Sequence, residues 1–139
     1  MEETIGVILK PGAPEAVAAA KRVRDIVPGV RLVTERDGYH AVAGLPDIER
    51  LSAAELERQC SLVVVFGGDG TLIHAASLFR ERSVPILGVN LGKIGFLTEV
   101  TVEEFPEALE KAVRDSLPVL ERMRLDVSIE RSGKELVAA

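Results

Sequence analysis

One stretch of the sequence decides the fold: Leu62-Val63-Val64-Val65-Phe66-Gly67-Gly68-Asp69-Gly70-Thr71. Its first half is a dense apolar run, typical of a strand that is buried on both faces of a sheet. A helical pattern comes next and places Leu72, Ala75 and Phe79 on one face. The stretch therefore predicts a strand, a glycine loop and a helix over 71–80, in that order.

The glycine loop has the properties of a phosphate cradle. Gly67, Gly68 and Gly70 lack the Cβ atoms that would keep a ligand from the backbone, and they permit the positive φ angles that such a turn needs. The loop leads into a helix N-terminus, where free N–H groups and the helix dipole favour an anion such as phosphate. Asp69 places a carboxylate in the middle of this anion-binding loop, so its presence there needs an explanation.

Length and composition limit the possible functions. The chain has 139 residues, enough for one ordinary domain with a real core, and a net charge of −5. Its 17 Lys and Arg residues form no basic block, so nucleic-acid binding is disfavoured. No apolar run approaches the roughly 20 residues of a membrane helix, and the acidic N-terminus does not resemble a secretory signal. A single cysteine, Cys60, excludes an internal disulfide, and we expect a reducing cytoplasm.

Alternating strand and helix patterns surround the central stretch. Apolar runs predict strands at 5–9, 30–33 and 84–90, and helical spacing predicts helices at 16–27, 52–59 and 101–112. Capping boxes, Ser52 with Glu55 and Thr101 with Glu104, mark two helix starts. The region 34–46 has no clear period and is predicted to be a loop. This order indicates an open, mostly parallel Rossmann-like α/β sheet with helices on both faces, whose ligands bind beyond the carboxyl ends of the strands.

The C-terminal part follows a different pattern. Alternating apolar residues from Met123 to Ile129 predict a half-solvated antiparallel strand, followed by a turn at 132–134 and a return strand over 135–138. We therefore expect two domains: residues 1–118 form an α/β catalytic domain, and residues 119–139 begin a truncated C-terminal β domain. Two strands rarely stand alone, so we expect this tail to self-associate or to be disordered.

Familiar nucleotide and catalytic motifs are absent. The stretch from Gly88 to Lys93 is one residue short of a P-loop, and Ile94 stands where the motif requires a hydroxyl. The dinucleotide fingerprint G-x-G-x-x-G lacks its third glycine, because Ile73 occupies that position. Only two histidines occur and they are far apart, which disfavours a histidine-rich metal site.

The remaining hypothesis is phosphoryl transfer. Gly67, Gly68 and Gly70 could direct N–H groups at phosphates, and Thr71 could add a hydroxyl. Asp69 could orient or deprotonate the attacking hydroxyl. The alternative is a tight turn in which Asp69 only caps the following helix.

Three further residues are candidates at the same edge of the sheet. His74 lies one helical turn after Thr71 and can face the cleft, or it is an ordinary half-exposed histidine. Asn90 ends its strand and can bind a base or ribose, or it forms the turn before Gly92. Phe96 can pack against a purine or nicotinamide ring, and core packing is an equal alternative.

Two blocks of sequence carry a family resemblance. The loop Gly67-Gly68-Asp69-Gly70-Thr71, together with Gly88-Val89-Asn90-Leu91-Gly92-Lys93-Ile94-Gly95-Phe96-Leu97-Thr98-Glu99, resembles the NAD kinases. The opening Ile5–Lys10 is similar to their first strand. Diacylglycerol and sphingosine kinases have loops similar to the first block, but they usually place a G-T-x-N-D-[LF] motif after the next strand. The second block therefore favours the NAD kinases.

The resemblance implies phosphorylation of the adenosine-ribose 2′-hydroxyl of NAD to give NADP. ATP would be the donor, or in some members polyphosphate, together with Mg²⁺ or another divalent ion. Asp69 would be the general base. Contacts to NAD or ATP would come from a set of residues that spans both blocks: Gly67, Gly68, Asp69, Gly70, Thr71, His74, Asn90, Gly92, Gly95, Phe96 and Leu97.

We also expect a cytoplasmic homo-oligomer, a dimer or tetramer at full length, with no nucleic-acid or membrane partner. The family's second motif, an Asn followed by Glu or Asp, does not occur here, because Leu91 follows Asn90. We therefore expect this segment to be inactive alone. The alternatives are a lipid kinase that shares the glycine loop and a non-catalytic nucleotide-binding regulatory module.

Overall fold

The computed structural model describes residues 3–37, 48–92, 95–98, 100–114, 117–125 and 127–138. Of the loop predicted over 34–46, residues 38–46 lie outside the described residues, as do Lys93 and Ile94 of the second glycine-containing block. The loop prediction is wrong for Thr34 and Glu35, which continue the strand that begins at Arg31.

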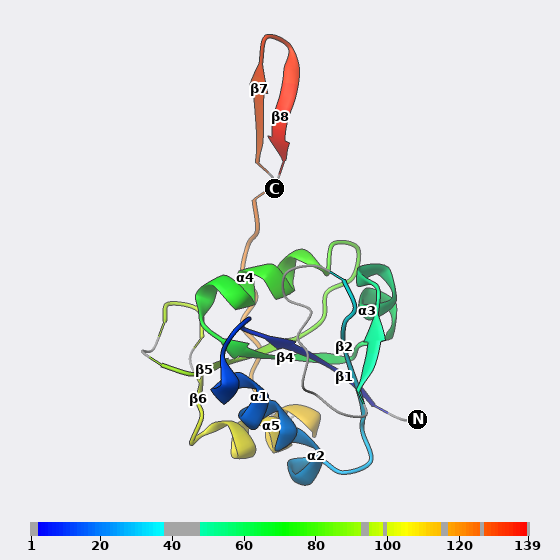
Figure 1. Cartoon of the computed structure of the whole chain (residues 1–139), viewed down its shortest axis with the longest axis vertical. Coiled ribbons are helices and arrows are strands. Elements are labelled where there is room, and N and C mark those ends of the chain that lie inside the picture. Colours follow the sequence, from blue (N-terminus) through cyan, green and yellow to red (C-terminus); the bar gives the residue numbers. More distant parts are fainter. Residues whose placement is uncertain are drawn as a thin grey trace.

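Within the described residues, six parallel strands form one sheet in the order β3-β2-β1-β4-β5-β6 (Figure 1). The strands are β1 (Thr4–Leu9), β2 (Arg31–Glu35), β3 (Glu49–Leu51), β4 (Leu62–Gly67), β5 (Ile86–Asn90) and β6 (Val100–Thr101). The order reverses between β1 and β4, and ligands of open α/β sheets bind beyond the carboxyl edge at such a reversal. The predicted parallel α/β sheet is confirmed.

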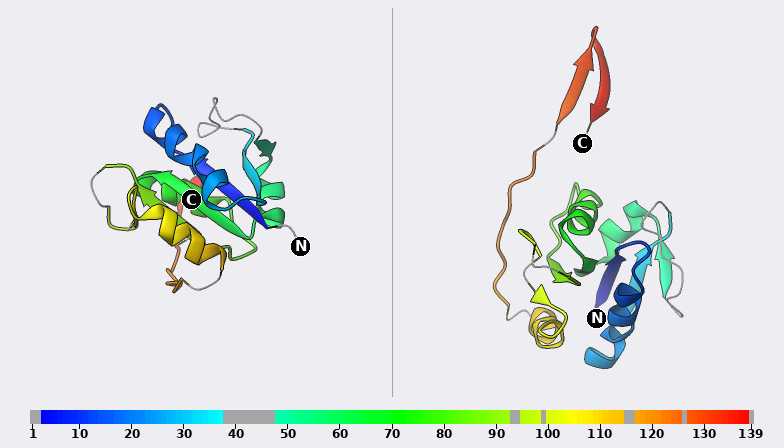
Figure 2. Two further views of the ribbon diagram at one scale, coloured as in Figure 1. Left: turned by 90° about the horizontal axis from the view of Figure 1, so that it is seen from below. Right: turned by 60° about the vertical axis from the view of Figure 1, so that its left-hand side comes forward.

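The helices cover both faces of this sheet. They are α1 (Pro14–Lys21), α2 (Val23–Ile26), α3 (Ala53–Gln59), α4 (Asp69–Ser77) and α5 (Phe105–Val113). Figures 1 and 2 show α1, α2 and α5 on one face and α3 and α4 on the other. The single helix predicted over 16–27 is divided at Arg22, whose N–H bonds to the Ala19 carbonyl at 3.1 Å in a tighter, 3₁₀-type turn.

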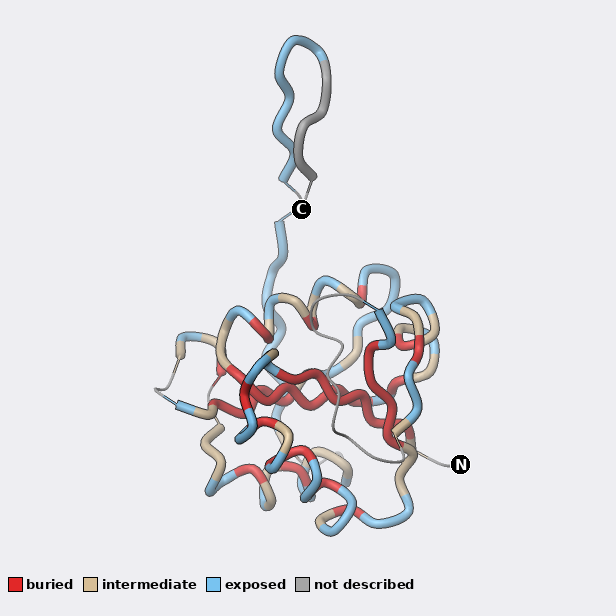
Figure 3. The backbone as a smooth tube through the Cα atoms, in the orientation of Figure 1, coloured by how far each residue is buried: buried red, intermediate tan, exposed pale blue. Residues whose placement is uncertain are grey.

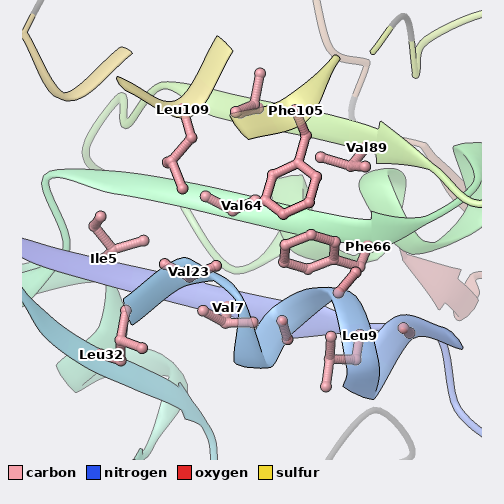
Figure 4. Packing of buried hydrophobic residues seen from close by; sticks show 14 of the residues in the cluster. Ile5, Val7, Leu9, Val23, Leu32, Val64, Phe66, Val89, Phe105 and Leu109 are labelled. Atoms are coloured by element: carbon pink, nitrogen blue, oxygen red, sulfur yellow. The ribbon is translucent and has the colours of Figure 1, made fainter. Parts of the chain in front are cut away.

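The central strands are buried from end to end, which explains their continuous apolar runs (Figure 3). Alternate side chains enter two separate cores: Val7 packs under α1, α2 and α5, whereas Ile8 packs under α3 and α4. In the first core the rings of Phe66 and Phe105 meet edge to face, with centroids 5.3 Å apart (Figure 4). Cys60 is fully buried in the second core, and burial raises its pKa to about 11.

The two predicted capping boxes differ in outcome: Ser52 begins α3, whereas α5 begins only at Phe105, after the turn that Thr101 and Glu104 form, so the helix start predicted at Thr101 is wrong. Ser52 Oγ accepts the Glu55 N–H at 3.3 Å and begins α3. Thr101 and Glu104 exchange two hydrogen bonds, at 3.1 and 3.2 Å, in the turn before α5. Strands β3 and β6 were not predicted, since three and two residues are too few to show a period.

The tail forms an antiparallel hairpin of β7 (Ser128–Arg131) and β8 (Lys134–Ala138), which projects from the α/β sheet (Figures 1 and 2). Ser132 and Gly133 have φ of 55° and 77°, as a two-residue hairpin turn requires. The strand predicted over 123–129 is wrong for Met123 to Leu125, which have no strand partner and no regular structure. None of the described helices has the length and apolar character that crossing a membrane requires.

Candidate active site

The glycine loop lies at the carboxyl end of β4, next to the point where the strand order reverses. Gly67 ends the strand, Gly68 is the helix N-cap, and α4 begins at Asp69, two residues earlier than the sequence predicts. Asp69 and Gly70 therefore belong to the first turn of the helix. At this end of α4 the free N–H groups and the positive end of the helix dipole meet.

The three glycines of the loop have different surroundings. The expected positive φ angles are wrong, since Gly67, Gly68 and Gly70 all lie outside that region. A Cβ on Gly67 would lie 2.6 Å from Thr71 Oγ1, so this position must be glycine for packing. A Cβ on Gly68 or Gly70 would meet no atom within 4 Å. These two glycines therefore leave open space above the loop.

Lys10 lies beside this loop and was not predicted as a site residue. Its N–H donates to the Phe66 carbonyl at 2.9 Å, and its Cβ lies 3.1 Å from where a Cβ on Gly67 would be. The side chain is exposed. It follows β1, which neighbours β4, so a positive charge stands at the reversal in strand order. The signal in the sequence was a basic residue directly after a buried strand.

The Asp69 carboxylate joins the two glycine-containing blocks. Its Oδ2 accepts the Phe96 N–H at 2.7 Å, and its Oδ1 accepts the Leu97 and Thr98 N–H groups at 3.0 and 3.1 Å. The Thr98 hydroxyl donates a further hydrogen bond to Oδ1 at 3.2 Å. All of these donors belong to the second block. The alternative that Asp69 only caps α4 does not describe this arrangement.

These hydrogen bonds also determine the charge of Asp69. The Leu97 N–H, followed by the Thr98 and Phe96 N–H groups, holds the pKa of Asp69 below its ordinary value of 3.8, and partial desolvation opposes this only in part. The carboxylate is therefore ionised at neutral pH. Asp69 can orient a hydroxyl by accepting its proton in a hydrogen bond, and it is a weak base.

Gly95 allows the second block to approach this carboxylate. A Cβ at Gly95 would lie 2.7 Å from the Asp69 carboxyl carbon, which is closer than real Cβ contacts come. Gly92 has no such constraint, because a Cβ there would meet no atom within 4 Å. The two glycines of this block thus differ: Gly95 accommodates Asp69, and Gly92 is exposed at the end of β5.

Asn90 and Thr98 are buried behind Asp69, at 5% and 0% exposure. The Asn90 Nδ2 donates to Thr98 Oγ1 at 2.7 Å, and the Gly92 N–H donates to Asn90 Oδ1 at 2.8 Å. Both polar ends of the Asn90 amide are thus bound to protein groups. Thr98 belongs to the second block, and the sequence alone does not predict a role for it. The signal for it was a hydroxyl residue directly after a glycine-containing segment at the ligand edge.

His74 points to the end of a different strand. Its Nε2 lies 2.8 Å from Oε2 of Glu35, which ends β2 and is 6% exposed. The sequence did not predict a role for Glu35, although a carboxylate that ends an apolar strand could have suggested one. The pair lies at the carboxyl edge of the sheet, the same edge as the glycine loop.

Phe96 and Thr71 have opposite environments. The Phe96 ring is 85% exposed, so the alternative that it packs in the core is wrong. Thr71 is 6% exposed, with its hydroxyl under Gly67. Leu97 is half-buried, and its N–H is already bound to Asp69.

The described residues do not build a metal site of their own. No group of three His, Cys, Asp or Glu side chains in the described ranges could hold an ion. Asp69 is the carboxylate at the loop, and both of its oxygens accept hydrogen bonds from the backbone. Mg²⁺ is often bound by one or two carboxylates together with substrate phosphates, so an ion here would depend on a ligand for most of its coordination.

Comparisons with known proteins agree with this arrangement. The family model for the ATP-NAD kinase N-terminal domain matches residues 33–117. The NAD kinase of Heliobacterium modesticaldum is 37% identical over 95% of this chain and 46% of its own length. The NAD kinase of Trichlorobacter lovleyi is 51% identical over 62% of this chain and 30% of its own length. The chain thus spans about half the length of the curated relatives that it matches most fully.

A solved structure shares the fold. The crystal structure of yeast NADH kinase complexed with NADH superimposes with a TM-score of 0.77, covering 99% of this chain and 46% of that one at 20% sequence identity. At this identity the likeness concerns the fold alone. The family match is independent of it and includes the glycine loop and the segment that binds Asp69. Since that match covers more than half of the chain, the protein belongs to the NAD kinase family.

Proposed function

We propose that the full-length protein carrying this chain transfers the terminal phosphoryl group of ATP to the adenosine-ribose 2′-hydroxyl of NAD, giving NADP. The observation that carries the proposal is an ionised carboxylate, Asp69, fixed beside open glycine backbone at a helix N-terminus. Phosphoryl transfer needs this combination, because phosphates must be positioned while a nearby group orients the attacking hydroxyl. Family membership supports the same chemistry.

The two oxygens of Asp69 would have different tasks. Oδ1 accepts three hydrogen bonds, whereas Oδ2 accepts one, from the Phe96 N–H. Because Oδ2 accepts a single hydrogen bond, it keeps capacity for a substrate hydroxyl. We assign to Oδ2 the hydrogen bond that orients the 2′-hydroxyl of NAD.

The low pKa of Asp69 is compatible with this role. In a loose transition state the bond from the terminal phosphorus to its bridging oxygen breaks early, and little negative charge is needed on the attacking oxygen. The 2′-oxygen forms the new bond to phosphorus, ADP leaves with the bridging oxygen, and the hydroxyl proton passes late to Asp69. Orientation by an ionised acceptor is therefore sufficient, and a strong base is not required.

The donor phosphates would lie over the open part of the loop. Gly68 and Gly70 leave room for them, the first N–H groups of α4 can donate to them, and Lys10 can supply a positive charge. A divalent ion bound with ATP would neutralise part of the phosphate charge. Polyphosphate could bind to the same groups as an alternative donor.

The remaining site assignments are proposals about NAD. The exposed Phe96 ring offers a face on which a base can stack, and the neighbouring Leu97 offers apolar contact. His74, oriented by Glu35, would contact the nucleotide from α4. We also keep Thr71, Asn90, Gly92 and Gly95 as site residues, although the buried Thr71 and Asn90 side chains would act from behind the ligand surface.

The tail supports a proposal about organisation. Residues 119–139 would open a second, mainly β domain, because Met123 and Leu125 are 87% and 73% exposed and the hairpin projects from the sheet. Apolar side chains exposed in this number normally have a partner. We expect the full-length protein to be a cytoplasmic dimer or tetramer.

The proposal is tested by measuring NADP formation from NAD and ATP with Mg²⁺ in the full-length protein. Asp69→Asn should lower kcat roughly 10²–10⁴-fold, the usual cost of losing such a group. Asp25→Asn on the exposed side of α2 is the matched control and should not change the rate. Turnover of diacylglycerol without turnover of NAD would favour a lipid kinase. Nucleotide binding without any turnover would favour a regulatory module.

A further inference from the structure

We propose that Asn90 and Thr98 are positioning residues, which form a one-way hydrogen-bond chain that fixes Asp69 Oδ1, while Oδ2, which accepts only the Phe96 N–H, can also accept the hydroxyl of the substrate. The chain joins the end of β5, the segment 95–98 and the first turn of α4. The role of this hydrogen-bond chain in catalysis rests on the proposed function. The hydrogen bonds themselves do not depend on that proposal.

The direction of every hydrogen bond in the chain is determined. The Gly92 N–H can only donate, so the group of Asn90 that it meets at 2.8 Å must be the carbonyl oxygen, Oδ1. The Asn90 NH₂ group therefore faces Thr98 and donates to Oγ1 at 2.7 Å. The Thr98 hydroxyl has a single proton, and this proton is left for Asp69 Oδ1, 3.2 Å away. A backbone N–H thus sets the orientation of each later group.

Burial prevents water from replacing these partners. Asn90 is 5% exposed and Thr98 is fully buried, so a broken link would leave a polar group without a solvent alternative. Among the described residues, no buried side-chain nitrogen or oxygen lacks a hydrogen-bond partner. The chain is therefore complete, and it can stay in one arrangement while ligands bind and leave above it.

The chain makes the two carboxylate oxygens of Asp69 different. The terminal torsion of an aspartate is broad, so without fixed donors the plane of the carboxylate could vary. Three donors, including the Thr98 hydroxyl, hold one oxygen, and only the Phe96 N–H holds the other. The carboxylate plane would then have the same orientation towards the substrate in every turnover.

The first test compares three variants in the full-length protein. Thr98→Val removes the hydroxyl at nearly constant shape and should lower kcat roughly tenfold to a hundredfold, with little change in KM, because the reacting hydroxyl loses its orientation. Thr98→Ser keeps the hydroxyl and should retain most of the activity. The control is Thr34→Val: Thr34 is equally buried, and its hydroxyl donates to the Val7 carbonyl at 2.6 Å, away from Asp69.

Asn90→Asp provides a second variant of constant shape. A carboxylate at position 90 has no N–H to donate, so the Thr98 proton would turn towards it and away from Asp69. The kcat should therefore fall at least as far as in Thr98→Val. If Thr98→Val failed to fold, this variant would still test the direction of the chain.

A second readout does not depend on catalysis. With ¹³C-labelled aspartate, the Asp69 carboxyl can be titrated by NMR and assigned by comparison with Asp69→Asn. The pKa of Asp69 should rise in Thr98→Val and stay unchanged in Thr98→Ser and Thr34→Val. If the full-length protein formed no NADP, the proposed function would fail. This titration would still show whether the Thr98 hydroxyl donates its hydrogen bond to Asp69. An unchanged Asp69 pKa with wild-type kcat in Thr98→Val, or an equal loss of activity in Thr34→Val, would overturn the inference.

Discussion

Gly70→Ala is the substitution that separates stability from function in this site. Gly70 is the second residue of α4, its φ is not positive, and a Cβ there would meet no atom within 4 Å. Alanine in a helix is more stable than glycine by about 0.5–1 kcal/mol, mainly because an unfolded chain with alanine has less conformational entropy to lose on folding. The variant should therefore unfold at a temperature ~2–4 °C higher.

The same methyl group should damage catalysis. It would occupy the open space in which we place the donor phosphates, and a displacement of about 1 Å at the reacting atoms can cost roughly 10²-fold in rate. We expect the KM for ATP to rise and kcat/KM to fall by about that factor. A variant that is more stable and less active would show that the glycine makes room for a ligand.

Thermal and urea unfolding measure the first effect, and initial rates of NADP formation measure the second. Gly88→Ala is the opposing control, because its Cβ would lie 2.7 Å from Leu72 Cδ1 and 3.1 Å from Thr98 Cγ2. This control should be less stable than the wild type. Wild-type kinetics for ATP and NAD in Gly70→Ala would refute the idea that phosphates occupy this space, and a loss of stability would refute the helical geometry.

Further predictions concern the core, the loop and pH. Phe105→Ala should lower the unfolding free energy by about 3–5 kcal/mol in urea titrations, whereas Phe96→Ala should change it by less than about 0.5 kcal/mol. A small loss for Phe105→Ala would contradict its place in the core. Lys10→Ala should raise the KM for ATP more than the KM for NAD, and the reverse order would place Lys10 at the acceptor. Because the folded state lowers the pKa of Asp69, its hydrogen bonds stabilise the fold above the ordinary value of 3.8, and this contribution is lost as the pH falls through the lower folded-state pKa. The difference in stability between wild type and Asp69→Asn should therefore shrink in acid, and a difference that is constant with pH would contradict it.

Local signals were sufficient to predict most of the fold. Strands buried on both faces, such as β1 and β4, must be apolar throughout, so they stand out in the sequence. The start of α3 at Ser52 is specified by a hydrogen bond that spans only three residues. The edge strands β3 and β6 depend on a neighbour and carry almost no pattern of their own. Residues 123–125 show the converse, because their alternating pattern forms no strand where no partner strand lies beside it.

The site was predictable in composition but not in arrangement. The sequence places both glycine-containing blocks at the same edge of the sheet, and the structure confirms it. It does not show that Gly95 must be glycine because of Asp69, since that contact joins residues 26 positions apart in the chain. Thr98 and Glu35 act on Asp69 and His74 through contacts of the same long-range kind. Such contacts cannot be predicted from local sequence patterns, because they form only when the folded sheet brings distant residues together.

The position of Asp69 in a glycine loop at a helix N-terminus now has a physical explanation. A carboxylate at a helix N-terminus would repel an incoming phosphate if its charge were uncompensated. Here three N–H groups and one hydroxyl from the second block donate to it and offset that charge locally. The N–H groups of α4 are then left for the phosphate. Because the two anions would bind to different sets of donors, the loop can hold a phosphate and an ionised Asp69 at once, and an acceptor hydroxyl between them can be oriented by one and attack the other.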